Sequence, residues 1–208
     1  MYIEVVEPAD RVGRKSLLTQ AFALRHRVFV EHRGWEFLRQ PDGLDVDRYD
    51  GGGTTHVLVL EDERLLGHVR LIPGGYLAIA RAEPARVHQA AGDADLYGLS
   101  RFCIAPWVSN SLTRRALNAC LFTAALRNVI DHGTHVLLFE TDPAMIFVLR
   151  VLGFSVQEVG EAAPIAGRLL QPIILRLDAS VLSALPLKIA NWTQAPSVGA
   201  TNFSEALS

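Results

Sequence analysis

The stretch HVLVLEDERLLGHVRLI, residues 56–72, decides the fold. Two apolar runs flank the short charged segment EDER at 61–64, which predicts two strands joined by a tight turn, a β-hairpin. A further apolar run, GLSRFCIAP at 98–106, predicts another strand that ends at a proline. Arg70 lies inside the hairpin and Arg101 inside the later strand. Both runs therefore hold a charge that a simple apolar core does not explain.

Outward from these strands, the spacing of apolar residues predicts the other elements. Apolar positions 17, 18, 21, 24, 28 and 29 predict a helix from Lys15 to about Glu31. The remaining predictions are strands at 2–6, 135–141 and 171–178, helices at 110–132 and 144–152, and a short helix within 81–93. This order predicts a mixed α/β fold with a mostly antiparallel sheet flanked by helices. It resembles the N-acetyltransferase superfamily, which implies a three-layer sandwich.

The length of 208 residues, half of them apolar, suits one folded domain with a sizeable core. We expect a single domain over residues 1–180 and a loosely ordered, polar tail over 181–208. A formal net charge of −2 argues against a nucleic-acid or anionic-membrane binder. Residues 32–55 form a long connection rich in turn residues, and such connections are usually functional or disordered.

The cysteines and the N-terminal segment indicate the cellular compartment. Cys103 and Cys120 form no metal or disulfide pattern, which favours a reducing environment. The opening MYIEVVEPADRVGRK lacks the basic-then-apolar order of a signal peptide. No apolar run reaches the roughly 18 residues that a membrane helix needs. We therefore expect a cytoplasmic protein with no membrane insertion, no metal and no cofactor.

Three arginines, Arg25, Arg70 and Arg101, call for anionic partners because an arginine is rarely buried unpaired. The acids that are not plainly solvated are Asp47 and Asp50, in the segment GLDVDRYDGGG. Each residue also has a plain structural explanation. A strand arginine can lie at a sheet edge or pair with a loop aspartate, and the aspartates can be turn formers.

The two aromatic residues before the aspartates complete the pattern. Phe29 lies four residues after Arg25, so the two share a helix face, and Trp35 follows in the long connection. Taken alone, Trp35 is most simply a loop anchor packed on the core. The co-occurrence of these aromatic, acidic and basic residues around one long loop favours a binding site.

The four segments LRHRVFVEHRGWEF, GLDVDRYDG, LLGHVRLIP and LSRFCI together resemble the acyl-homoserine-lactone synthases, the bacterial autoinducer synthase family. The resemblance implies an acetyltransferase-like fold. It also implies a reaction between S-adenosylmethionine and an acyl thioester carried on acyl carrier protein or coenzyme A. The positions that match the family's hallmarks are Arg25, Phe29, Trp35, Asp47, Asp50, Arg70 and Arg101. One hallmark differs, because Gly98 stands where family members usually have a glutamate.

S-adenosylmethionine suits this set of residues. An arginine fork binds a carboxylate through two oxygens, and Asp47 can hold the ammonium group. The faces of Phe29 and Trp35 suit the adenine and the sulfonium. We therefore expect the seven hallmark residues to bind S-adenosylmethionine as a substrate.

The reaction needs a base for the amine and donors for the oxyanion. The absent glutamate leaves Asp95, Glu140 and Asp142 as nearby acids, of which we favour Glu140. A solvated position at the end of a strand would explain Glu140 equally well. We expect Ser100 to orient a water, Arg101 to act at the reacting groups, and backbone N–H groups around 101–104 to face the thioester carbonyl.

The acyl donor is read from the turn APWVSNSLTRRAL, which lacks the glycine of ordinary coenzyme A sites. This is compatible with a carrier-protein donor that meets Arg114 and Arg115, although a solvated helix face explains both arginines. The candidates for lining the acyl pocket are Phe102, Cys103, Phe139 and Met145. Core packing explains these four equally well.

Three functions follow in order of preference. The first is synthesis of an acyl-homoserine lactone with release of methylthioadenosine. The second is transfer of an acyl group to another amino acid or amine by the same fold. The third is a degenerate homologue that binds S-adenosylmethionine without turnover.

Overall fold

The computed structural model describes residues 1–74, 82–92, 94–177 and 183. The strands are β1 (Tyr2–Val6), β2 (Thr55–Glu61), β3 (Arg64–Pro73), β4 (Tyr97–Ile104), β5 (Val136–Thr141), β6 (Ser155–Glu158), β7 (Ala163–Ile165) and β8 (Arg168–Arg176). The α-helices are α1 (Lys15–Arg25), α2 (Pro84–Ala91), α3 (Ser111–Asp131) and α4 (Pro143–Val151). Short helices η1 (Pro8–Asp10), η3 (Glu36–Leu38) and η4 (Arg48–Asp50) and the π-helix η2 (His26–His32) complete the order.

The strands form one mixed sheet in the order β1-β2-β3-β4-β5-β8-β6, with β7 paired to β8. Among the described strands only the β4–β5 pair is parallel, so the predicted mixed, mostly antiparallel sheet is confirmed. The predicted hairpin is β2 and β3. The sequence patterns missed β6 and β7, and the predicted tail lies outside the described residues apart from Ser183.

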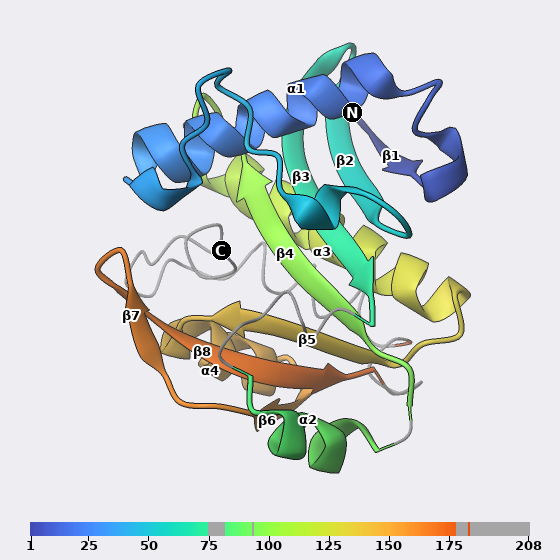
Figure 1. Ribbon diagram of the computed structural model, residues 1–208, viewed down its shortest axis with the longest axis vertical. Coiled ribbons are helices and arrows are strands. Elements are labelled where there is room, and N and C mark those ends of the chain that lie inside the picture. Colours follow the sequence, from blue (N-terminus) through green and yellow to red (C-terminus); the bar gives the residue numbers. More distant parts are fainter. Residues whose placement is uncertain (75–81, 93, 178–182, 184–208) are drawn as a thin grey trace.

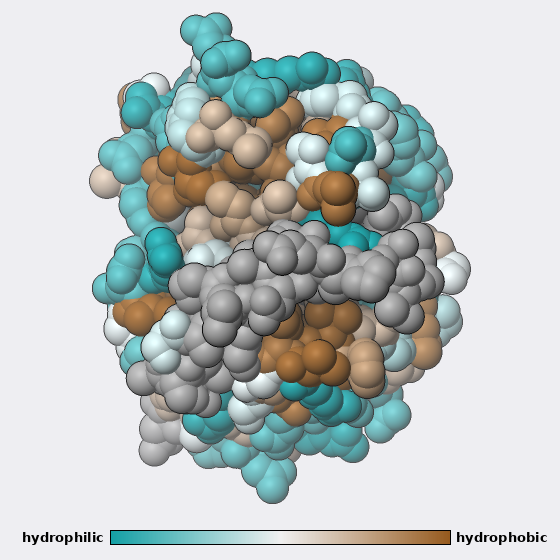
Figure 2. All heavy atoms as spheres, turned by 180° about the vertical axis from the view of Figure 1, so that it is seen from behind, coloured by the Kyte–Doolittle hydropathy of each residue, from teal (hydrophilic) through white to brown (hydrophobic). Residues whose placement is uncertain are grey.

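Helices cover both faces of the sheet (Figure 1). Helix α1 crosses in front of β2 and β3, and α3 lies behind them. Phe22 of α1 packs edge-on against His56 of β2, while Phe122 of α3 packs against Phe102 of β4. The core is therefore split into two layers by the sheet. Seen from behind, hydrophilic side chains form the top and bottom rims and hydrophobic ones gather between them (Figure 2).

The predicted helix from Lys15 to Glu31 is two elements, which corrects the expectation of one regular helix. Residues Lys15–Arg25 are α-helical, and His26–His32 widen into a π-helix. A π-helix adds a residue to each hydrogen-bonded turn, so it rotates the side chains that follow it. Phe29 is fully buried at the centre of this wider segment.

Candidate active site

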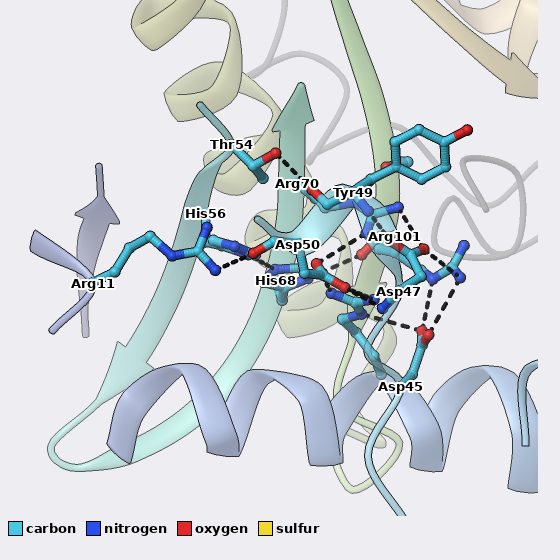
Figure 3. A network of polar contacts seen from close by, with 12 residues as sticks. Arg11, Asp45, Asp47, Tyr49, Asp50, Thr54, His56, His68, Arg70 and Arg101 are labelled. Carbon is cyan, nitrogen blue, oxygen red and sulfur yellow. Dashed lines mark hydrogen bonds and ion pairs between the residues drawn. The ribbon is translucent and has the colours of Figure 1, made fainter. Parts of the chain in front are cut away.

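Three arginines and three aspartates meet in one cluster between the long loop and strands β3 and β4 (Figure 3). We call it the ion-pair cluster. It consists of Arg25, Asp45, Asp47, Asp50, Arg70 and Arg101. The predicted arginine partners Asp47 and Asp50 are present, and Asp45, which sequence reasoning missed, is the third acid.

Arg25 ends α1 and is fully buried. Its two Nη groups donate to Asp50 Oδ1 at 2.6 Å and Oδ2 at 3.0 Å. Its Nε donates to Asp45 Oδ2 at 3.1 Å. All three guanidinium nitrogens therefore donate to protein carboxylates, and the pairing with loop aspartates explains why an arginine lies on a buried helix face.

Arg70 projects from β3 and forms a second fork. Its Nη1 and Nη2 donate to the two carboxylate oxygens of Asp47 at 2.6 and 3.1 Å. Its Nε donates to Ser100 Oγ at 3.0 Å, and Nη1 lies 2.9 Å from Asp50 Oδ1. Arg70 thus ties the loop to both β3 and β4.

Arg101 lies at an irregularity in β4. In the β3–β4 register His68 faces Cys103 and Arg70 faces Ser100, so Arg101 and Phe102 together oppose the single residue Val69. This is a β-bulge, and Arg101 has the left-handed value φ = +55°. That conformation costs a non-glycine residue about 1–2 kcal/mol. The structure holds it because Arg101 donates to Asp45 from Nε at 2.6 Å and to Asp47 from Nη2 at 3.3 Å.

The loop that carries the acids is itself hydrogen-bonded. Asp47 caps η4 by accepting from the Tyr49 N–H at 2.8 Å, and Asp50 accepts from the Asp47 N–H at 2.8 Å. Arg11 donates to the carbonyl oxygen of Asp50 from the other side. The turn chemistry predicted for the aspartates is therefore real, and the same carboxylates also serve the arginines.

Electrostatics favour the charged form of the buried acids. Burial alone raises the pKa of Asp50, but the hydrogen bonds and charges of Arg25, together with Arg70, outweigh it and hold that pKa well below its usual range. Burial also opposes ionisation of Asp45, and the charges of Arg25 and Arg101 overcome it. Burial lowers the pKa of Arg25, and its partners Asp50 and Asp45 more than restore it. Asp45, Asp50 and Arg25 are therefore charged at neutral pH.

The two predicted aromatic residues lie beside the cluster. The ring of Phe29 lies 5.4 Å from that of Trp35, and the guanidinium of Arg101 lies 5.7 Å from the Phe29 ring centre. Trp35 in turn stacks on the exposed ring of Phe37. The indole Nε1 of Trp35 is buried and has no hydrogen-bond partner among the described residues.

Strands β4 and β5 separate next to the cluster. They pair only at Tyr97–Leu137 and Gly98–Leu138. Beyond these pairs, Ser100 and Glu140 each lie two residues further along, so both point to the same face of the sheet, across the gap from one another. We call this gap the wedge. Glu140 is half-buried at the end of β5, and its role as a base stays a prediction beside the solvated strand end.

The residues expected to line the acyl pocket are all deep in the core. Phe102, Cys103, Phe139 and Met145 are each almost fully buried. Phe102 packs on Phe122 of α3, and burial raises the pKa of Cys103 to about 12, which keeps it a neutral thiol. Nothing in their packing separates a lining role from core packing, so the acyl-lining role stays a prediction.

Arg114 differs from the surface arginine that was expected to meet a partner. Its guanidinium donates to the carbonyl oxygens of Ala105 at 3.2 Å and Val108 at 2.9 Å. Asn110 caps α3 by accepting from the Thr113 N–H at 3.0 Å. The turn between β4 and α3 is therefore fixed by side chains in place of the glycine-rich backbone of ordinary coenzyme A sites.

Sequence reasoning missed two further buried polar features. His56 and His68 lie on the α1 side of the hairpin, and both are fully buried. Asn118 is buried in α3, and neither of its amide atoms has a hydrogen-bond partner among the described residues. The register of the hairpin could have revealed the two histidines. A polar residue within an apolar helical stripe could have revealed Asn118.

The described residues hold neither a metal-ligand group nor a membrane-spanning helix. No group of three or more metal-ligating side chains is present in that part of the chain. No helix within it is long and apolar enough to cross a membrane.

Comparison with known proteins bears on this site. The sequence model of the autoinducer synthase family matches residues 11–184. The isovaleryl-homoserine lactone synthase of Bradyrhizobium diazoefficiens is 45% identical over 134 residues, which are 63% of this chain and 59% of that protein.

Solved structures agree with the family match. BjaI, a CoA-dependent acyl-homoserine lactone synthase solved with S-adenosylmethionine and isopentyl-CoA, superposes with a TM-score of 0.73. It is 26% identical, and the match covers 94% of this chain and 90% of that one. An acyl-CoA N-acyltransferase from Pseudomonas aeruginosa, 19% identical, shares the fold with a TM-score of 0.57 over 84% of this chain and 99% of that one.

Proposed function

Because the chain belongs to the autoinducer synthase family, we propose that it makes an acyl-homoserine lactone from S-adenosylmethionine and an acyl thioester. The observation that carries the proposal is the ion-pair cluster beside the wedge. Fixed charges for a zwitterion then adjoin an opening between two parallel strands where an acyl thioester can enter. The product class is a quorum-sensing signal, and the proposed compartment is the cytoplasm.

The residues of the ion-pair cluster have two roles: some keep the acids in place, and others bind the substrate. The side chains of Arg25 and Arg70 are 0% and 2% exposed, whereas those of Arg101 and Asp47 are 14% and 27% exposed. We assign the carboxylate of S-adenosylmethionine to Arg101 and its ammonium to Asp47, because only these groups can be reached. Arg25 and Arg70 keep the acids in place, and Phe29 and Trp35 form the aromatic wall.

The first chemical step is acyl transfer. The amine of the substrate loses a proton and attacks the thioester carbon, and the thiol leaves as the amide forms. We assign Glu140 as the base. We assign Ser100 the role of orienting a water between the two side chains, because Ser100 and Glu140 face the same side of the wedge. Gly98 pairs with Leu138, which is two residues before Glu140. The carboxylate of Glu140 can therefore reach the space that a glutamate side chain at position 98 would occupy.

The second step closes the lactone. The carboxylate of the substrate attacks the carbon next to the sulfonium, and methylthioadenosine leaves with the bonding electrons. The sulfonium is already a good leaving group, so the protein needs mainly to orient the carboxylate. Arg101 suits that role because its guanidinium is fixed by Asp45.

For the donor we propose a coenzyme A thioester. BjaI, whose structure was solved with S-adenosylmethionine and isopentyl-CoA, is named a CoA-dependent synthase. An acyl carrier protein remains the alternative donor, and Arg115 at the start of α3 is then its first contact. Comparing turnover with the same acyl group on each carrier separates the two.

Gly98 favours a second candidate function, transfer to another amine or binding without turnover. Mass spectrometry of organic extracts from cells that express the chain separates these. We expect an N-acyl-homoserine lactone, and its mass gives the acyl group. An acylated amine other than homoserine lactone would support the second candidate.

A further inference from the structure

Two buried histidines connect the hairpin to the bulge in β4 (Figure 3). His56 Nδ1 and His68 Nε2 are 3.0 Å apart. His68 Nδ1 lies 3.2 Å from the carbonyl oxygen of Arg101. The chain of contacts therefore runs from β2 through β3 to the one irregular residue of β4.

The direction of these hydrogen bonds follows from chemistry. A carbonyl oxygen only accepts, so His68 Nδ1 carries the proton and donates to Arg101. Burial, aided by nearby positive charges and opposed by Asp50, lowers the pKa of His56 to about 3 and that of His68 well below its ordinary value, so both rings are neutral. His68 Nε2 is then a bare acceptor, and His56 Nδ1–H donates to it. His56 Nε2, at the far end, has no hydrogen-bond partner among the described residues.

The bulge decides where the Arg101 side chain points. Successive side chains of a regular strand alternate between faces. Here Ser100 contacts Arg70, and Arg101 contacts Asp45 and Asp47, so neighbouring residues both face the ion-pair cluster. Phe102 then faces α3 on the other side. Without the extra residue, a regular strand would send Arg101 to the α3 side and away from the cluster.

We propose that the His56–His68 pair is a positioning device that holds the Arg101 bulge and thereby places the Arg101 guanidinium at the substrate. His68 acts directly on the Arg101 backbone, and His56 fixes the tautomer of His68. Neither ring touches the reacting atoms, so both are positioning residues. The effect on turnover rests on the proposed function, whereas the hydrogen-bond arrangement does not.

The first test reads the tautomers by long-range proton–nitrogen NMR of histidine-labelled protein at pH 7. We expect both His56 and His68 to be neutral with the proton on Nδ1. A charged His68, or a proton on its Nε2, would overturn the proposal, because the ring then lacks the donor or the acceptor that the chain of contacts requires.

The second test uses two matched variants of His68. Asparagine places its amide nitrogen where Nδ1 stands, and glutamine places its own where Nε2 stands. His68→Asn keeps the donor to Arg101, and His68→Gln removes it. We expect His68→Gln to lower kcat/KM for S-adenosylmethionine roughly 10- to 100-fold and His68→Asn to stay within about threefold of wild type, since misplacement by 1 Å has effects of that size.

Thermal unfolding of the same two variants separates a loss of Arg101 positioning from a general loss of stability. We expect similar melting temperatures and different kcat/KM values. Equal kcat/KM values, whether both reduced or both unchanged, would overturn the positioning role. If the wild-type protein makes no lactone with any donor, the proposed function fails, while the tautomers still report on the histidine pair.

Discussion

At the scale of single residues, Gly98 and Glu140 define the chemical question. Position 98, where the resemblance to the family implies a glutamate, is a glycine here, and the half-buried Glu140 lies on the neighbouring strand two residues beyond the partner of Gly98. The parallel register of β4 and β5 connects the two positions. Sequence spacing alone does not, because 41 residues of chain, including α3, lie between them.

The first prediction concerns Glu140. Glu140→Gln keeps the shape of the side chain and removes the base, so we expect turnover to fall by on the order of 10²-fold or more. The measurement is the initial rate of methylthioadenosine release. Glu158→Gln, at an exposed carboxylate on β6, is the matched control and keeps wild-type turnover. Unchanged turnover in Glu140→Gln would remove Glu140 as the base.

The second prediction contrasts two aspartates three residues apart. Asp50→Asn removes the carboxylate that accepts from both Nη groups of the buried Arg25 and leaves Asp45 as its charged partner, so we expect the free energy of unfolding to fall by about 3–5 kcal/mol. Asp47→Asn alters a partly exposed group, so we expect a smaller loss of stability and a raised KM for S-adenosylmethionine. Urea unfolding and initial-rate kinetics measure the two effects. Equal losses of stability would contradict the division between holding and binding.

At the scale of elements, the irregular segments place the site. The π-helix at His26–His32 and the bulge at Arg101 each insert a residue into a regular pattern. The spacing of apolar residues predicts regular elements only, so the sequence predicted neither the π-helix nor the bulge. The hallmark residues were nevertheless found, because the family pattern records residue types and spacing whatever the local backbone does.

The third prediction concerns the packing of α3 on the sheet. Asn118 buries an amide without a partner among the described residues, so Asn118→Leu should raise the free energy of unfolding by about 1–3 kcal/mol. Asn128→Leu, on the same helix, is the matched control. The Asn128 Nδ2 donates to Glu7 Oε1 at 2.8 Å, so its loss should destabilise the protein. Thermal and urea unfolding measure both, and a destabilised Asn118→Leu would show that the amide is satisfied.

At the scale of the whole molecule, the order of elements was predictable and the polar interior was not. The hairpin, the long helix and the strand after it follow from apolar periodicity and were correctly placed. Asp45 and the histidine pair are defined by contacts between distant segments, such as that between Asp45 and Arg101, which are 56 positions apart in the sequence. Such contacts require the sheet register, which the sequence of one chain does not state.

The fourth prediction is the pH dependence of stability. His56 and His68 have pKa values below the ordinary value of about 6.5 in the folded protein and regain that value on unfolding. The unfolded chain therefore binds more protons below pH 6.5, and the free energy of unfolding falls as pH is lowered, by up to ~1.4 kcal/mol per pH unit for each ring.

Substitution of both rings isolates this effect. A His56→Phe, His68→Phe variant should show a flatter pH dependence between pH 6.5 and 4.5 in urea unfolding. Asp45 and Asp50, whose pKa values are held low, contribute below their usual range near 3.8, so this window belongs to the histidines. An unchanged slope in the double variant would contradict the burial of two neutral rings.

The central claim is that this chain completes lactone synthesis without the glutamate at position 98. The most direct test incubates the purified protein with S-adenosylmethionine and a series of acyl-CoA donors, and quantifies both products by mass spectrometry. We predict methylthioadenosine and N-acyl-homoserine lactone in equal amounts from at least one donor. Binding of S-adenosylmethionine with neither product from any acyl-CoA or acyl carrier protein donor would contradict the account.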